Sequence, residues 1–189
     1  MPEEIEDRPA EGIIGEVEKR AIVIADYDPA WPRRFGREEA KIRGALGPAA
    51  LSIEHVGSTS VPGLAAKPII DILLVVADSG DEGAYLPALE EAGYVLRVRE
   101  PDFEEHRMVR TPEKDVHVHI FSPGAREGER LLLLRDHLRH NEEDRGLYAG
   151  TKRELATRDW PSMQNYADAK TDVVEDILTR ASGPSREQR

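Results

Sequence analysis

The sequence contains no cysteine, and this absence excludes several kinds of chemistry. Without thiols, the 189-residue chain can form no disulfide, no thiolate metal site and no cysteine nucleophile. A chain without disulfides suits a reducing compartment, so we expect a cytoplasmic protein. The acidic start also lacks the basic and then apolar pattern of a secretory signal peptide.

Aromatic residues and long apolar runs are also scarce. Aromatics make up 5% of the chain, too few for a strip of side chains that stacks on single-stranded nucleic acid. No apolar run approaches the roughly 18 residues that suggest a membrane span, so we expect no membrane partner. The sequence shows no Walker motif, no zinc-ligand cluster and no catalytic-triad pattern.

Positive charge is in the minority. A formal net charge of -11 disfavours broad nucleic-acid binding, which relies on Lys and Arg to neutralise phosphates. A small phosphorylated ligand needs only a few local cations, so the charge is compatible with a ligand of that kind.

The length suits a single domain with a substantial core. We expect this domain over residues 21–180. Residues 1–20 would form a flexible polar tail or, as the alternative, a short helix near 15–20, and 181–189 would form a second polar tail.

Apolar periodicity predicts an α+β fold with a mixed sheet, because strands come first and helices follow. The run at 69–76 is apolar on both faces, which indicates a central strand covered on both sides. The expected strands are 21–25, 51–56, 69–76, 94–99, 106–111 and 115–121, the last two forming a hairpin. The expected helices are 28–46, 81–92, 127–140, 142–158 and 162–180.

A small-residue loop follows the strand that ends at Val56. Such a loop brings backbone N–H groups and a hydroxyl close to a phosphate. The alternative is a plain turn, since glycine and serine are common in turns. The candidate phosphate-binding residues of this loop are Gly57, Ser58, Thr59 and Ser60.

A lone acid, Asp71, opens the apolar strand that follows this loop. A carboxylate entering a buried strand is costly unless it holds a metal or a hydrogen-bonding partner. The alternative is an Asp that caps the preceding loop. Lys67 precedes Pro68 and so lies on an extended segment, from which it would reach a phosphate or remain a solvated lysine.

Three further residues are candidate metal ligands beside Asp71. Glu54 precedes the Gly-Ser turn, and His117 and His119 share one face of a later strand. Imidazole suits Zn, Mn or Fe better than Mg. The alternatives are that Glu54 pairs with an arginine and that the two histidines form only a polar sheet face.

Two pairs of residues spaced by four lie on predicted helix faces and would clamp a phosphate. Arg135 pairs in this way with Arg139, and Lys170 with Tyr166. We take Arg135 and Lys170 as phosphate-binding candidates. The alternative for both pairs is that they make ordinary helix-surface or interhelical contacts.

The segment Glu54-His-Val-Gly-Ser-Thr-Ser-Val-Pro-Gly-Leu-Ala-Ala-Lys-Pro-Ile-Ile-Asp-Ile72 resembles the GrpB family of the nucleotidyltransferase superfamily. The resemblance spans roughly 22–180, with supporting segments at 27–32, 117–121, 134–139 and 166–170. It implies a nucleotidyltransferase-like mixed β-sheet with flanking helices and a C-terminal helical layer.

In this superfamily the acid at the position of Asp71 binds a divalent ion, so the resemblance implies a divalent metal cofactor, Mg or Mn, while the two histidines make Zn the alternative. We take Asp71 and also Glu54, which precedes the Gly-Ser turn, as the catalytic candidates. A second acid normally stands two residues further on, where this chain has Leu73. Paired carboxylates bridge the ions of two-metal phosphoryl chemistry, and Leu73 breaks that pair.

Three functions are compatible with these residues. The first is metal-dependent transfer of a nucleotidyl group from a nucleoside triphosphate to a small acceptor. The second is a catalytically inactive domain that binds a nucleotide, a CoA-like ligand or a protein, in line with family relatives fused to a dephospho-CoA kinase domain. The third is a small metal-dependent hydrolase that uses His117 and His119.

Overall fold

The computed structural model describes residues 12–19 and 21–183. Its strands are β1 (Ser52–Val56), β2 (Ile70–Val75), β3 (Val95–Glu100), β4 (His106–Arg110) and β5 (Val116–Phe121). Its α-helices are α1 (Trp31–Leu46), α2 (Leu86–Glu91), α3 (Arg126–His140), α4 (Glu142–Ala156), α5 (Met163–Asp168) and α6 (Thr171–Ser182). Short 3₁₀ turns cover Gly47–Ala49, Ser58–Ser60 and Glu82–Ala84.

The five strands form one mixed sheet in the order β1-β2-β5-β4-β3. Strands β2 and β5 run parallel, whereas the other neighbouring strands are antiparallel. The register places Asp71 opposite both Val56 of β1 and His117 of β5. Residues that lie opposite each other point to the same face, so the predicted acid and histidines share one side of the sheet.

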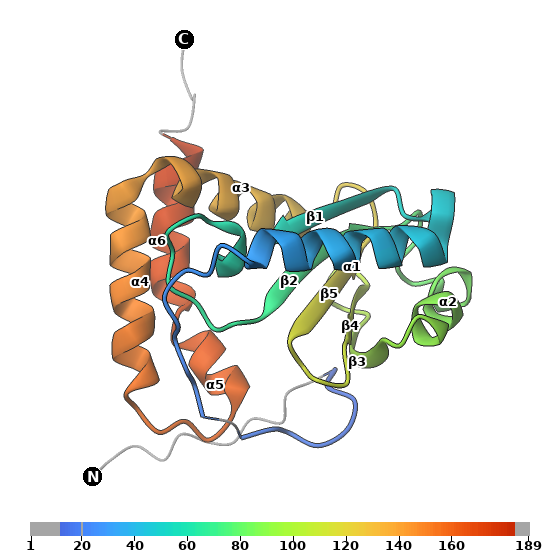
Figure 1. Ribbon diagram of the computed structural model, residues 1–189, viewed down its shortest axis with the longest axis horizontal. Coiled ribbons are helices and arrows are strands. Elements are labelled where there is room, and N and C mark those ends of the chain that lie inside the picture. Colours follow the sequence, from blue (N-terminus) through green and yellow to red (C-terminus); the bar gives the residue numbers. More distant parts are fainter. Residues whose placement is uncertain (1–11, 20, 184–189) are drawn as a thin grey trace.

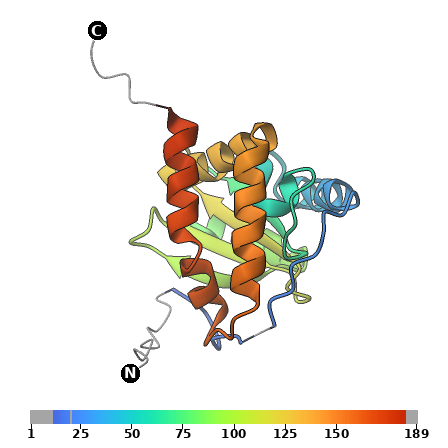
Figure 2. The same cartoon turned by 90° about the vertical axis from the view of Figure 1, so that its left-hand side faces the viewer.

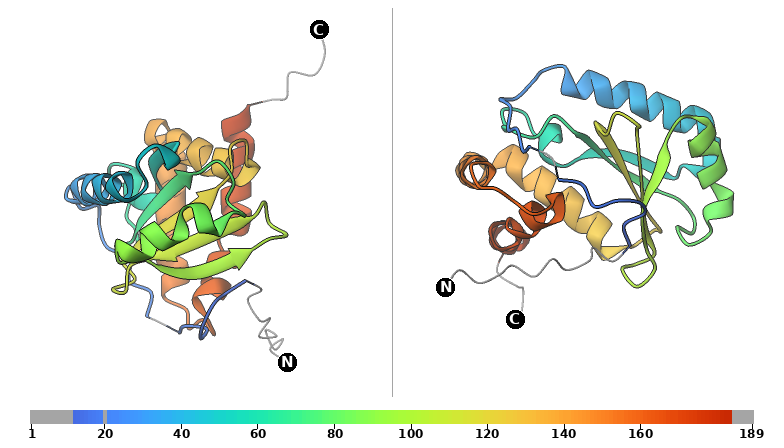
Figure 3. Two further views of the ribbon diagram at one scale, coloured as in Figure 1. Left: turned by 90° about the vertical axis from the view of Figure 1, so that its right-hand side faces the viewer. Right: turned by 90° about the horizontal axis from the view of Figure 1, so that it is seen from below.

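Helices α1 and α2 cover one face of the sheet. Alternation along β2 turns Ile70, Ile72 and Leu74 to this side, where they pack with Trp31 and Leu89. Figure 3 shows the resulting layers in its right-hand view, with α1 and α2 on one side of the sheet and the C-terminal helices on the other. The prediction of a central strand apolar on both faces is therefore confirmed.

Helix α3 covers the opposite face, where Val56, Leu73 and Phe121 form a small apolar cluster. Helices α4 and α6 stand next to each other beyond the end of the sheet (Figures 1 and 2). They join α3 and the loop after β1 in a separate core that includes Leu64 and Ile177. The predicted C-terminal helical layer is confirmed, and it packs directly against the Gly-Ser loop.

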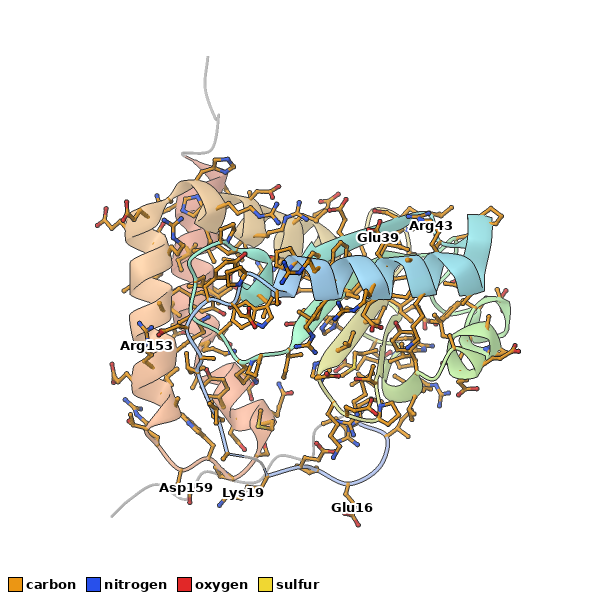
Figure 4. The ribbon with its side chains drawn as sticks, viewed as in Figure 1. Glu16, Lys19, Glu39, Arg43, Arg153 and Asp159 are labelled. Carbon is orange, nitrogen blue, oxygen red and sulfur yellow. The ribbon has the colours of Figure 1, made fainter. Side chains whose placement is uncertain are left out.

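The strand predicted at 21–25 is wrong. The segment makes only a single bridge, between Ala25 and Ala66. The short helix predicted near 15–20 is also not formed over the described residues, because Gly15 has a φ of +87° and Ile14 instead donates its N–H to the Arg97 carbonyl at 2.8 Å. Lys19 then pairs with Asp159 at 3.2 Å, as their adjacent side chains in Figure 4 show.

Two predicted helices are broken in the structure. The helix expected at 81–92 begins as the 3₁₀ turn Glu82–Ala84 and becomes α-helical only at Leu86, just before Pro87. Proline favours the first turn of a helix, so α2 starts there. The helix expected at 162–180 divides into α5 and α6, with Lys170 between them. That break turns Lys170 toward the site described next.

The predicted tails lie mostly outside the described residues, which omit 1–11, 20 and 184–189. Within the part of the chain that the structure describes, no helix is both long enough and apolar enough to cross a membrane.

Candidate metal and phosphate site

Two neighbouring parallel strands bring three potential metal ligands together. Asp71 on β2 lies opposite His117 on β5, and His119 follows on the same face. One ligand atom from each of the three side chains lies within 4.8 Å of the other two. Their side chains are 30%, 23% and 26% exposed, so the cluster is open to solvent on one side. Three ligand atoms this close together, with one side open to solvent, are compatible with a cation that takes a further ligand.

The surroundings of this cluster favour an ionised Asp71 and a neutral His117. Burial opposes ionisation of Asp71, but His119, His117 and Lys67 outweigh it and lower the pKa of the carboxyl. Burial lowers the pKa of His117 to about 4, and the positive charges nearby lower it further against the effect of Asp71. A metal ligand must be deprotonated, and both residues meet that condition at neutral pH.

The turn after β1 packs closely against the side chain of Asp71. Gly57 has φ +69° and ψ -177°, a conformation that glycine tolerates far better than other residues. A Cβ atom at this position would lie 2.6 Å from Asp71 Oδ2. The glycine that the sequence places in the candidate phosphate loop is therefore also required for the close approach of that loop to Asp71.

The three hydroxyl groups of this turn have different hydrogen-bond partners and different exposure. Thr59 Oγ1 donates to the Ile69 carbonyl at 3.0 Å and meets His55 Nε2 at 3.0 Å. Ser60 Oγ donates to the Gly57 carbonyl at 2.5 Å. Thr59 and Ser60 are both buried and thus hold the shape of the turn, which leaves Ser58 as the hydroxyl that is half-buried beside the cluster.

A lysine that the sequence did not single out lies behind the turn. Lys152 of α4 is 3% exposed and donates to Ser58 Oγ at 2.8 Å and to the Ala65 carbonyl at 2.5 Å. Burial lowers the pKa of Lys152 to about 7, and the charges of Lys170, Arg153 and Lys67 add to the effect. A signal was present in the sequence: Tyr148, Lys152 and Leu155 share the buried face of one helix.

Two further lysines flank a buried tyrosine nearby. Lys67 Nζ lies 5.0 Å and Lys170 Nζ 4.6 Å from the centre of the Tyr166 ring. Burial lowers the pKa of Lys170 to about 8, with Lys67 adding to the effect and Asp71 opposing it. Tyr166 is fully buried, and its hydroxyl has no hydrogen-bond partner among the described residues. Crowded ammonium groups and a hydroxyl without an acceptor favour an anionic ligand.

Glu54 and Arg135 form an ion pair instead of joining the three ligands. Arg135 donates to Glu54 Oε2 at 2.7 Å and to the His55 carbonyl at 3.1 Å. Glu54 on β1 lies opposite Leu73, which follows Asp71 by two residues on the same face of β2. Both residues stay predictions as site residues, and the structure places them at the edge of the turn.

A second histidine and a glutamate stand behind His119. His106, 8% exposed, contacts Glu100 Oε2 through Nδ1 at 2.6 Å and His119 Nδ1 through Nε2 at 3.2 Å. Burial lowers the pKa of His106, against the opposing effect of Glu100. The sequence offered one signal for this residue, because His106 begins a strand whose partner strand carries His119.

The ligand set fits a single divalent ion. It offers one carboxylate and two imidazoles, whereas Leu73 offers no ligand and is buried with Val56 and Phe121. Two imidazoles and one carboxylate with open positions are typical of a first-row transition ion. The residues fit a metal, but they do not supply the carboxylate pair of a two-metal site.

Comparison with known proteins gives a consistent result. The family described as GrpB protein matches residues 21–180. A UPF0157 protein of Halalkalibacterium halodurans is 55% identical over 162 residues, which cover 86% of this chain and 83% of the relative. The crystal structure of the conserved protein GrpB from Enterococcus faecalis is 33% identical with a TM-score of 0.75, over 84% of this chain and 96% of that one.

A more distant neighbour shares the fold alone. A chain of the GLD-2/RNP-8 complex superposes with a TM-score of 0.53 at 14% identity, over 86% of this chain and 63% of that chain. This likeness shows a shared fold alone, and it agrees with the mixed sheet and flanking helices described above.

Proposed function

The chain belongs to the GrpB protein family, and from the geometry of its site we propose that it is a metal-dependent nucleotidyltransferase that acts on a small acceptor with a nucleoside triphosphate. One observation carries the proposal. The ligand atoms of Asp71, His117 and His119 lie beside the Gly57 turn, which Lys152 contacts, and the charges of Lys67 and Lys170 act on Lys152. A triphosphate bound to a divalent ion needs both a ligand cluster and nearby cations.

Separate groups of residues would bind the metal ion and the phosphates. Asp71, His117 and His119 would hold the ion, which when bound supplies positive charge for the α-phosphate and the departing pyrophosphate. Lys152 and Lys170 would neutralise phosphate oxygens, because a bound anion favours the protonated form that burial disfavours in both lysines. Ser58 would donate its hydroxyl to the same ligand.

A second function is supported by one observation, the apolar Leu73 at the position of the usual second acid. Leu73 is 2% exposed and packs into the apolar cluster under α3. Strand β2 (Ile70–Val75) carries no acid besides Asp71. The alternative is therefore a catalytically inactive domain that binds a nucleotide or a CoA-like ligand.

Thermal unfolding with a panel of ligands tests both functions. We expect one nucleoside triphosphate with Mn²⁺ to raise the melting temperature, since binding at 100 times Kd adds about 2.7 kcal/mol, or roughly 5–10 °C for a chain of this size. EDTA should remove the shift, and so should Asp71→Ala. Asp102→Ala is the matched control, because Asp102 lies exposed in the turn between β3 and β4.

The outcomes separate the two functions. A metal-dependent shift accompanied by pyrophosphate release supports the transferase. A shift with a nucleotide or CoA that survives EDTA, without pyrophosphate release, supports the binding domain. No shift in the wild type with any nucleotide or with CoA contradicts both.

A further inference from the structure

We propose that Glu100 and His106 are positioning residues that fix the tautomer of His119 and so present its Nε2 to a first-row transition ion. This inference rests on the metal site of the proposed function. Its physical basis is a continuous chain of polar contacts from Glu100 through His106 and His119 to Asp71.

The direction of each hydrogen bond follows from the group at the outer end of the chain. A carboxylate oxygen accepts hydrogen bonds, so His106 donates through Nδ1 to Glu100 Oε2 across the 2.6 Å contact. A neutral imidazole has one donor and one acceptor nitrogen, so His106 Nε2 accepts. His119 must then donate from Nδ1 across the 3.2 Å contact.

This hydrogen-bond direction determines which nitrogen of His119 faces Asp71. With its proton on Nδ1, His119 turns the lone pair of Nε2 toward Asp71 Oδ1, 3.5 Å away. Two acceptors that face each other attract a cation between them, and 3.5 Å exceeds the length of an ordinary N–H···O hydrogen bond. The chain of contacts therefore prepares an imidazole nitrogen and a carboxylate oxygen to bind one ion.

The surroundings of His106 hold this arrangement in place. Its ring stacks on Phe121 with a centroid distance of 4.7 Å and an interplanar angle of 16°. It lies nearly parallel to the ring of His119, at 13°, with a centroid distance of 5.4 Å. A ring fixed in this way cannot turn its nitrogens around without losing both packing and hydrogen bonds.

The nature of the ion follows from the ligands. Mg²⁺ prefers oxygen ligands and keeps much of its water, whereas imidazole suits Zn, Mn, Fe and Co. A site with two imidazole ligands, one of them held by a carboxylate through a second histidine, resembles the outer-shell arrangement common at transition-metal sites. We expect Co²⁺ and Zn²⁺ to bind at least about 100-fold more tightly than Mg²⁺.

The test compares wild type, His106→Phe and the control His140→Phe. Phenylalanine keeps the stack on Phe121 but cannot accept from His119, whereas His140 is exposed at the end of α3. Titration with Co²⁺ should show a loss of roughly 10- to 100-fold in affinity for His106→Phe and no change for His140→Phe. ¹⁵N NMR of the metal-free wild type should show His119 protonated on Nδ1, and His106→Phe should lose that preference.

The two proposals can fail separately. If the wild type binds Co²⁺ and His106→Phe binds it equally well, the inference is overturned and the metal site stands. If His119 of the wild type carries its proton on Nε2, the inference is overturned whatever the metal does. If the wild type binds no metal ion, the metal site of the proposed function fails as well.

Discussion

Replacing Lys152 by methionine is expected to weaken triphosphate binding by roughly 30-fold to several thousand-fold. Removing one partner of a buried, hydrogen-bonded charge pair costs about 2–5 kcal/mol, which corresponds to that range. Methionine fills nearly the same space, so the core around Tyr148 and Leu155 stays packed. The measurement is calorimetric titration of inorganic tripolyphosphate in the presence of Mn²⁺.

The same variant should change how stability depends on pH. Unfolded, Lys152 has an ordinary pKa near 10.5, whereas burial lowers the pKa of the folded residue to about 7. Between these values the unfolded chain binds a proton that the folded chain has released, so stability rises with pH. By pH 9 the gain is on the order of 2 kcal/mol. Lys152→Met should remove most of this rise and leave the smaller part contributed by Lys170.

Lys19→Met is the matched control, because Lys19 is exposed and pairs with Asp159 at the surface, away from the Gly-Ser turn. It should bind tripolyphosphate like the wild type and keep the rise in stability above pH 7. A Lys152→Met protein that bound tripolyphosphate normally would show that the lysine serves only to tie the turn to α4. A flat stability profile in the wild type would contradict its low pKa.

The sequence contained enough information for the sheet but not for the whole site. Alternation along 115–121 placed His117 and His119 on one face, and the apolar run after Asp71 marked a central strand. These are local patterns with a period of two, so they can be read without knowing the fold. The pairing of β2 with β5, which sets Asp71 opposite His117, became visible only in three dimensions.

The missed residues come from long-range contacts. Lys152 is 94 residues from its partner Ser58, and a helix face alone does not say which loop it will meet. Glu54 was expected beside Asp71, and strand geometry does put them on the same face. The arginine of α3 that pairs with Glu54, Arg135, lies 81 residues away, and no periodicity in the sequence predicts such a pair.

The break before Lys170 was missed for a different reason. The segment 162–180 has the apolar spacing of one helix, and neither Gly nor Pro interrupts it. The structure ends α5 at Asp168 and starts α6 at Thr171, which brings Lys170 against the Tyr166 ring at 4.6 Å. Tertiary packing thus overrides a helical pattern at the point where the chain meets the candidate phosphate site.

Replacing Gly57 by alanine is expected to abolish the function of the site at a modest cost in stability. The new Cβ would lie 2.6 Å from Asp71 Oδ2, a distance that real side chains do not tolerate, so either the turn or the carboxylate must move. A displacement of about 1 Å in such a site costs roughly 100-fold, and we expect that loss in Co²⁺ affinity. The positive φ adds about 1–3 kcal/mol of strain to the folded state.

Gly47→Ala separates the contact from the strain. Gly47 also has a positive φ, of +53°, but a Cβ there would meet nothing within 4 Å. Both variants should therefore lose stability in chemical denaturation, while only Gly57→Ala should lose Co²⁺ and tripolyphosphate binding. Equal binding by both variants would mean that the turn does not press on Asp71 in solution. If only Gly57→Ala lost Co²⁺ binding, the loss would come from the contact between the added methyl group and Asp71, because the matching methyl group at Gly47 meets no other atom within 4 Å.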